Sequence, residues 1–151
     1  MTRVIVLDSG PLGIITNPRQ TPEVLACAAW LRSILAAGAR VVLPEIADYE
    51  LRRELLRAGK QNGLRHLDAA GQTLDYVPVT TAAMRRAAEL WADLRHQGLP
   101  TADAHAIDAD TTLAAQALLT VALGDTLVVA TTNVGHLSRI VPAQRWQNIL
   151  P

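Results

Sequence analysis

The sequence predicts a three-layer α/β/α fold with a central parallel sheet of four to five strands. Apolar runs rich in β-branched residues, at 3–7, 40–43 and 126–130, are typical of fully buried strands. Segments with helical periodicity separate these runs, and such an alternation favours a parallel sheet covered on both faces. The chain shows no linker, repeat or low-complexity segment, so we expect residues 1–151 to form a single domain.

The predicted elements follow one another in a regular order. Thr21 provides a cap, Pro22 occupies the first helical position after it, and Gly38 stops that helix. The other boundaries rest on the same kinds of signal. In chain order we expect a strand at 3–7, a turn at 8–13, a helix at 22–37, a strand at 40–43, helices at 45–56 and 64–70, a strand at 74–79, a helix at 81–98, a polar loop at 99–106, a helix at 108–123, a strand at 126–130 and a short strand at 146–150.

The composition limits the kinds of function that the chain can have. Lys plus Arg and Asp plus Glu number 14 each, so there is no global positive field to attract nucleic acid, and any RNA contact must be local. Cys27 is the only cysteine, which excludes a disulfide within the chain and favours an inert core thiol. The apolar run before Asp8 is too short for a secretion signal, and the tract at 113–123 is too short to span a bilayer. We therefore expect a cytoplasmic protein without membrane contact.

Three carboxylates are placed where parallel sheets usually carry their functional sites. Asp8 closes the first strand, and its carboxyl end is where such sites form. Asp110 heads the apolar stripe of its helix, so its carboxylate needs a cation or a basic partner. Glu50 lies about 40° from the inward-facing Ile46 on the helix after the second strand. Oxygen donors from three separate units suit Mg²⁺ or Mn²⁺, and the chain has no His or Cys cluster to suit zinc.

Each of these acids also has a purely structural explanation. Asp8 could cap the turn that follows its strand, and Asp110 could be an ordinary acid stabilised by the helix dipole. Glu50 could form a surface salt bridge with Arg53 or Arg57. Alternatively, these two arginines offer guanidinium groups to a phosphate that passes the metal. A metal site requires the three acids to lie close together, whereas the structural explanations do not.

Neighbouring acids are assigned to caps or to the surface. Asp108 points about 200° away from Asp110, so it is either a helix cap or a ligand that acts through water. Asp48 and Arg52 are spaced as an exposed i,i+4 ion pair. Asp103 is expected to be a solvated loop residue.

Four short segments, in the same order along the chain, resemble the PIN-domain family. Residues 6–12, Val-Leu-Asp-Ser-Gly-Pro-Leu, resemble its strand-terminal acid motif, and residues 47–53 resemble its helix with the second acid. Residues 110–117 are similar to the family's DxxIAAxA helix. Residues 128–137 resemble the segment that ends the next strand with a Thr and an Asp or Asn. The resemblance spans nearly the whole chain.

The resemblance implies a PIN-like, Rossmann-like fold and the activity of a VapC-like ribonuclease. Asp8, Glu50 and Asp110 would then be the catalytic acids and the ligands of Mg²⁺ or Mn²⁺ in an endoribonuclease that hydrolyses RNA phosphodiester bonds. Asn133 takes the fourth position, where many members have Asp, so it would act by holding a metal-bound water. His136 is expected to be structural or to face RNA.

The resemblance also implies partners besides an RNA substrate. Many small members are toxins paired with an antitoxin that inserts an Arg or Lys into the acidic site, and members commonly form homodimers.

The alternative function is a non-catalytic PIN-fold RNA-binding or regulatory module, which Asn133 leaves open. A haloacid-dehalogenase phosphatase is excluded, because it needs a second acid where this chain has Gly10. A helix face that could serve either a homodimer or the core carries Ala88, Leu90, Trp91 and Leu94.

Overall fold

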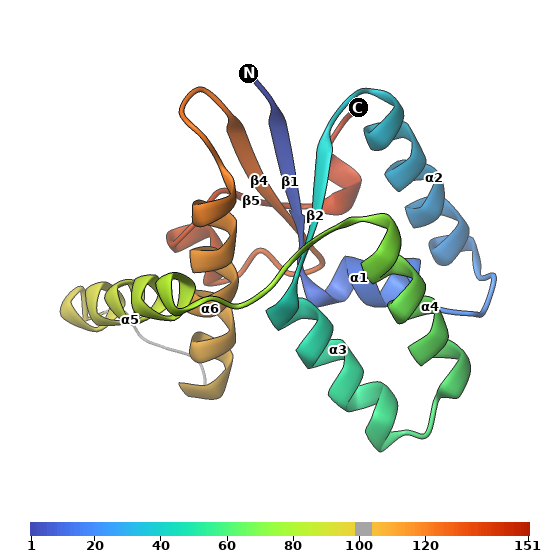
Figure 1. Ribbon diagram of the computed structural model, residues 1–151, viewed down its shortest axis with the longest axis horizontal. Helices are drawn as coiled ribbons and strands as arrows, with labels where there is room; N and C mark the ends of the chain where they lie inside the picture. The colour runs from blue at the N-terminus through green and yellow to red at the C-terminus, as the bar shows by residue number, and fades with distance from the viewer. Residues whose placement is uncertain (99–103) are drawn as a thin grey trace.

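Five parallel strands form one sheet with β1 at its centre (Figure 1). The structure is a computed structural model that describes residues 1–98 and 104–151, and only the backbone of 104–107. The strand order is β3-β2-β1-β4-β5. The strands are β1 (Arg3–Leu7), β2 (Arg40–Pro44), β3 (Asp75–Val77), β4 (Thr126–Thr131) and β5 (Ala143–Arg145). The predicted α/β fold with a parallel sheet of four to five strands is confirmed.

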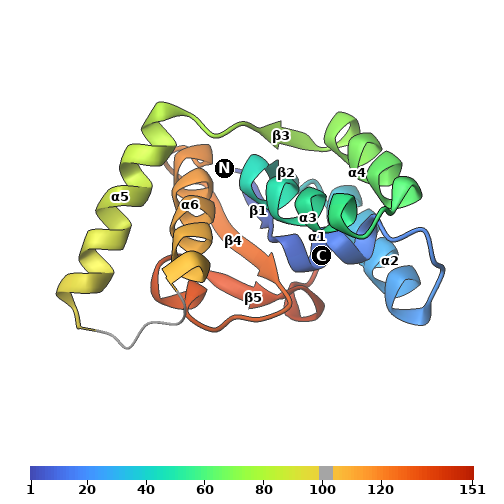
Figure 2. The same ribbon diagram turned by 90° about the horizontal axis from the view of Figure 1, so that it is seen from below.

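Helices cover both faces of the sheet, which gives the three predicted layers (Figures 1 and 2). Helix α2 packs on one face and α6 on the other. In the part of the chain that the structure describes, no helix has the length and apolarity needed to cross a bilayer. The helices are α1 (Ser9–Ile15), α2 (Pro22–Ala36), α3 (Glu45–Arg57), α4 (Gln61–Thr73), α5 (Thr81–His96) and α6 (Ala104–Thr120), with 3₁₀ turns η1 (Leu137–Arg139) and η2 (Trp146–Asn148).

Successive residues of β1 face opposite layers, as the two-residue period of a strand requires. Ile5 and Leu7 belong to the apolar cluster that contains Trp30 of α2. Val4 and Val6 belong to the cluster formed with α6. Because both faces of the strand are buried, its sequence is a continuous apolar run rather than an alternating one.

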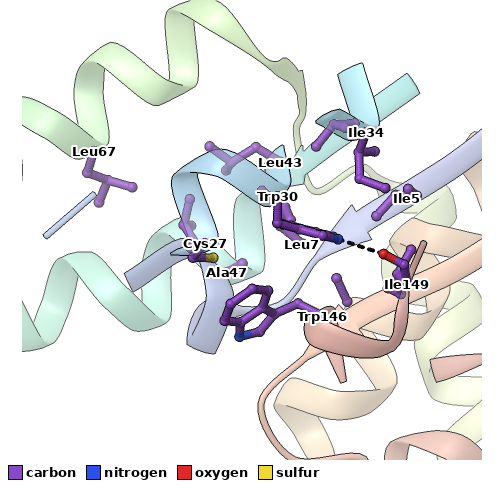
Figure 3. Close-up of a cluster of buried hydrophobic side chains, with 13 residues drawn as sticks. Ile5, Leu7, Cys27, Trp30, Ile34, Leu43, Ala47, Leu67, Trp146 and Ile149 are labelled. Carbon is purple, nitrogen blue, oxygen red and sulfur yellow. Dashed lines mark hydrogen bonds between the residues drawn. The ribbon is translucent and has the colours of Figure 1, made fainter. Parts of the chain in front are cut away.

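Cys27 lies in the α2 cluster, which also contains Trp30 and Trp146 (Figure 3). The indole Nε1 of Trp30 donates a hydrogen bond to the carbonyl of Ile149 at 2.9 Å, which ties α2 to the C-terminal segment. Burial, with a smaller contribution from the charge of Glu23, raises the pKa of the Cys27 thiol to about 12. Cys27 is therefore a buried, free thiol, as the sequence predicted.

The segment after β1 is the helix α1 and not the predicted turn. Asp8 caps this helix, and Pro11 fits into its first turn because an N–H at that position has no helical partner. Gly10 lies against Thr132 in the loop after β4, where an added Cβ would come within 2.7 Å of Thr132 Cγ2. This close approach places the start of α1 beside the end of β4.

The boundaries of α6 and of the last strand also differ from the prediction. Helix α6 begins at Ala104, so the end of the predicted loop is helical and Asp108 lies within the helix. Asp103 lies outside the described residues. Strand β5 precedes Trp146, and the predicted strand at 146–150 instead begins with η2. A run of three residues such as β5 is too short to show a strand period.

Helix α5 packs against α6 and uses part of the face that was predicted to serve a homodimer or the core. Leu90 and Leu94 are buried, and Leu90 lies in the α6 cluster. Ala88 and Trp91 are exposed. Core packing therefore accounts for the two leucines but not for the exposed pair.

Candidate active site

Asp8 is fixed at the carboxyl end of β1 by three hydrogen bonds. Its backbone N–H donates to the carbonyl of Ala130 at 2.9 Å, which continues the pairing of β1 with β4. One carboxylate oxygen accepts from the Ser9 N–H at 2.7 Å, and the other accepts from Thr131 Oγ1 at 2.8 Å. Asp8 therefore both follows the end of β1 and caps α1, and its side chain is half-buried.

Thr131 orients the carboxylate of Asp8. Its side chain is buried, and its hydroxyl also accepts a hydrogen bond from the Asn133 N–H at 3.1 Å. The family-like segment at 128–137 ends its strand with a Thr, but no role was predicted for Thr131. Its place at the end of β4, the neighbour of β1 in the sheet, is the signal that could have indicated it.

Thr131→Val removes the hydroxyl that orients Asp8, and the loss of such a group from a metal site usually weakens metal binding about tenfold. We therefore expect the variant to lower the Mn²⁺ affinity, and the ribonuclease activity proposed below, by about this factor. The measurements are calorimetric Mn²⁺ titration and the initial cleavage rate. Thr120→Val, which removes a hydroxyl bonded to Ala117 within α6, is the control and should leave both quantities unchanged. Equal effects of the two substitutions would contradict the orienting role of Thr131.

Asp8, Glu50 and Asp110, hereafter the acidic cluster, lie within electrostatic range of one another. Burial raises the pKa of Glu50, the charge of Asp8 raises it further, Arg53 opposes the rise, and Asp110 adds a smaller increase. Burial also raises the pKa of Asp110 to about 6, with a further rise from Asp8 and a decrease caused by His136. The charges of residues from β1, α3 and α6 thus act on one another, and their sharing of one metal ion stays a prediction.

The acidic cluster has the donor chemistry of a site for a hard divalent cation, since carboxylate oxygens are the ligands that Mg²⁺ prefers. Within residues 1–98 and 108–151, however, no three His, Cys, Asp or Glu side chains are grouped closely enough to hold one ion together. Mg²⁺ keeps several waters and usually binds one or two protein carboxylates directly. The cluster therefore has suitable donors for Mg²⁺ or Mn²⁺, which Asp8, Glu50 and Asp110 would hold without all three binding the ion directly.

Gln116 of α6 sets the position of α3 relative to α6. Helix α3 follows Pro44 and has no side-chain cap, but the Ile46 N–H in its first turn donates to Gln116 Oε1 at 3.1 Å. Gln116 Nε2 donates to the carbonyl of Val77 at 2.9 Å. The side chain is only 1% exposed. The sequence signal was an amide that interrupts the apolar tract at 113–123.

Replacing Gln116 by Met should destabilise the protein by about 1–3 kcal/mol, because the substitution leaves the Ile46 N–H and the Val77 carbonyl buried without partners. Urea unfolding monitored by circular dichroism measures this free energy. The exposed Gln72 of α4 offers the same substitution as a control, and Gln72→Met should change stability by less than about 0.5 kcal/mol. Similar losses for the two variants would show that the interhelical hydrogen bonds contribute nothing.

The structure places Asp108 away from the acidic cluster. It is exposed on the side of α6 that faces α5, where it lines a surface hollow of about 410 Å³ together with Trp91. The capping prediction is wrong because α6 starts four residues earlier. This position also gives no support to a water-mediated contact with a metal.

The ion pair of Asp48 and Arg52 is formed, but it is not the exposed pair that helical spacing predicted. Asp48 is only 7% exposed, and it accepts from Arg52 Nε at 2.7 Å and from the Tyr76 hydroxyl at 3.2 Å. Arg52 also donates to Asp68 of α4 at 2.7 Å. Because α4 and β3 pack over this side of α3, the pair joins three elements of the fold.

The remaining predicted residues differ in how firmly neighbouring groups hold them. Asn133 is exposed in the loop after β4, with its backbone held by Thr131, and half-buried His136 is close enough to Asp110 to lower its pKa. Arg57 is held by Glu54 in an ion pair of 2.8 Å on the surface. Arg53 instead stacks on Tyr49.

Comparison with known proteins identifies the fold. The sequence matches no protein-family model and no curated protein sequence. The structure is similar to VapBC2 from Rickettsia felis, solved with a DNA fragment from its promoter, at a TM-score of 0.70 and 16% identity over 95% of this chain and 98% of that one. It is similar to FitAcB from Neisseria gonorrhoeae at a TM-score of 0.68 and 20% identity over 96% and 99% of the two chains.

A third similar structure is the sarcin-ricin loop cleaving toxin VapC20 from Mycobacterium tuberculosis. The TM-score is 0.59, with 16% identity over 89% of this chain and 93% of that one. The three structures match 95%, 96% and 89% of this chain. The fold of this chain is therefore the VapC-like PIN fold that its sequence motifs resemble.

Proposed function

We propose that this protein is a divalent-metal-dependent endoribonuclease that hydrolyses RNA phosphodiester bonds at the acidic cluster. The observation that carries the proposal is the interaction of three half-buried carboxylates, in which the charge of Asp8 raises the pKa of both Glu50 and Asp110. Among the described side chains, none of the three forms an ion pair with a basic residue. Arg53 and His136 offset part of the cluster's negative charge, and burial of the rest is costly without a cation.

The residues of the cluster have distinct chemical roles. A bound Mg²⁺ or Mn²⁺ would supply Lewis acidity at a phosphoryl oxygen and would lower the pKa of a bound water. The carboxylate of Asp8 is held in one orientation by Ser9 and Thr131, which suits a ligand. Burial and the charge of Asp8 raise the pKa of Glu50 and of Asp110, which favours proton uptake by these two carboxylates.

We propose further that the protein acts as the toxin of a toxin–antitoxin pair. The support is its fold, shared over nearly the whole chain with VapBC2, FitAcB and the RNA-cleaving toxin VapC20. An antitoxin Arg or Lys inserted into the acidic cluster would take the place of the cation, because a guanidinium group pairs well with carboxylates in a partly buried site. Homodimerisation is part of the proposal, and the exposed Trp91 offers a surface for it.

The direct test is incubation of the purified full chain with structured RNA in Mn²⁺, Mg²⁺ or EDTA. We expect cleavage with either ion and none in EDTA. A calorimetric Mn²⁺ titration should show binding heat at the acidic cluster that Asp110→Asn reduces. A protein that neither cleaves RNA nor takes up Mn²⁺ would contradict the proposal.

The second candidate is a non-catalytic PIN-fold module that binds RNA or regulates another protein. It is favoured by the exposed amide of Asn133 at the fourth position and by the lack, among the described residues, of a three-ligand metal group. In that case wild type, Asp8→Asn and Asp110→Asn would bind RNA equally and leave it intact.

A further inference from the structure

An exposed aromatic ring, that of Tyr49, comes from the residue that precedes Glu50 on α3. The chain has only three Trp, two Tyr and no Phe. Trp30 and Trp146 pair in the core, and Tyr76 bonds to Asp48. Tyr49 is 56% exposed, compared with 38% for Trp91. The exposed Tyr49 ring precedes Glu50 on α3 and is therefore available to a ligand at that side of the helix.

Arg53 stacks on this ring and stays free of carboxylates. Its guanidinium carbon lies 5.2 Å from the centroid of the Tyr49 ring, as i,i+4 spacing on α3 allows. Among the described residues no acid lies within ion-pair distance of Arg53, whereas Arg57, one turn further along the helix, is held by Glu54. The charge of Arg53 opposes the rise in the Glu50 pKa, so the guanidinium is within electrostatic range of the cluster.

Helical geometry places the pair on one side of Glu50. At 100° per residue, Arg53 lies about 60° and Tyr49 about 100° around α3 from Glu50, in the same rotational direction. A strand of RNA that reaches the acidic cluster therefore passes next to the pair. The cluster itself repels phosphates, so a cation at its border is needed to hold the strand.

We infer that Tyr49 and Arg53 bind one nucleotide of a single-stranded RNA beside the acidic cluster, with the tyrosine ring stacked on the base and the guanidinium group on the phosphate. The inference rests on the proposed ribonuclease function and adds the contact that selects unpaired substrate. Base–aromatic stacking tolerates any sequence, because every base has a π-face. It requires an unstacked base, so duplex RNA is not bound in this way.

Binding of a ten-nucleotide single-stranded RNA, followed by fluorescence anisotropy in EDTA over a range of salt concentrations, separates the two contacts without any cleavage. Tyr49→Ala should weaken binding roughly tenfold and leave the salt dependence unchanged, since stacking releases no counterions. Tyr49→Phe keeps the ring and should restore wild-type affinity. Arg53→Gln should weaken binding and reduce the log–log salt slope by about 0.7.

Two controls make the test specific. Arg95 stacks on Trp91 of α5, with its guanidinium carbon 4.9 Å from the ring centroid, and forms a similar pair on a different helix. Arg95→Gln removes this pair and should leave RNA binding unchanged. Duplex RNA of the same sequence should bind wild type and Tyr49→Ala equally.

Three outcomes would overturn the inference. The first is that Tyr49→Ala binds the single strand with wild-type affinity, and the second is that Tyr49→Ala loses as much affinity for duplex RNA as for the single strand. The third is that Tyr49→Ala shifts from dimer to monomer in sedimentation, which would make the pair an interface between two copies. Cleavage in Mn²⁺ is measured separately on wild type. If wild type fails to cleave but shows the expected binding pattern, the proposed function fails while the nucleotide contact stands.

Discussion

Asp8→Asn and Asp110→Asn are each expected to reduce metal-dependent RNA cleavage by at least roughly 100-fold while leaving the fold intact. Asparagine has the shape of aspartate but carries no charge, so a divalent cation loses its main attraction. At position 8 the amide oxygen can still accept from the Ser9 N–H, and the amide N–H can donate to the Thr131 hydroxyl. Single-turnover cleavage in Mn²⁺ and far-ultraviolet circular dichroism measure activity and fold.

The matched control is Asp108→Asn, which makes the same substitution two residues away on α6. Because Asp108 faces α5 and not the acidic cluster, cleavage by this variant should equal that of wild type. A loss of activity similar to that of Asp110→Asn would show that α6 as a whole, and not the position of one carboxylate, determines cleavage.

The second large effect is on stability. In EDTA, Asp110→Asn should be more stable than wild type at pH 7.5 by on the order of 1–3 kcal/mol, because burial and Asp8 raise the pKa of Asp110 to about 6. The folded state thus binds this proton more tightly than the unfolded state does. Proton binding by Asp110 therefore contributes fully to wild-type stability below about pH 4, and this contribution is lost as the pH rises through about 6. Asp110→Asn should lack this dependence when urea unfolding is measured from pH 4 to pH 8.

Metal should reverse the order of stability of the two proteins. A ligand that binds only the folded state stabilises it by mass action, so saturating Mn²⁺ should raise the melting temperature of wild type more than that of Asp110→Asn. If Asp110→Asn were less stable than wild type in EDTA at pH 7.5, then Asp110 would be a stabilising partner in the fold and not a strained acid.

The sheet was predictable because it depends on local patterns, and the three candidate acids were chosen from patterns of the same kind. The β-branched runs predicted β1, β2 and β4, since strands buried on both faces have no polar alternation. Asp8 was predicted from its place at a strand end, and Glu50 and Asp110 from their angles relative to apolar stripes. Such signals need no knowledge of which elements pack together.

The features that the sequence did not predict depend on contacts between distant segments. Residues 9–13 contain two glycines and a proline, which locally favour a turn, yet contact with Thr132 accompanies a helix there. Asp48 looked exposed because helical arithmetic does not show that α4 and β3 cover its side of α3. The partners of Gln116 are 39 and 70 residues away in the chain, beyond the reach of any local pattern.

The burial of Cys27 has a practical consequence for spectroscopy. Thiol-reactive dyes attack the thiolate, and this thiol is both inaccessible to solvent and protonated at neutral pH. A reporter cysteine introduced on the exposed surface of α3 would therefore be the only reactive thiol of the folded chain, with no need to replace the native one. Fluorophores attached there could follow the arrival of RNA in real time in an otherwise unaltered protein.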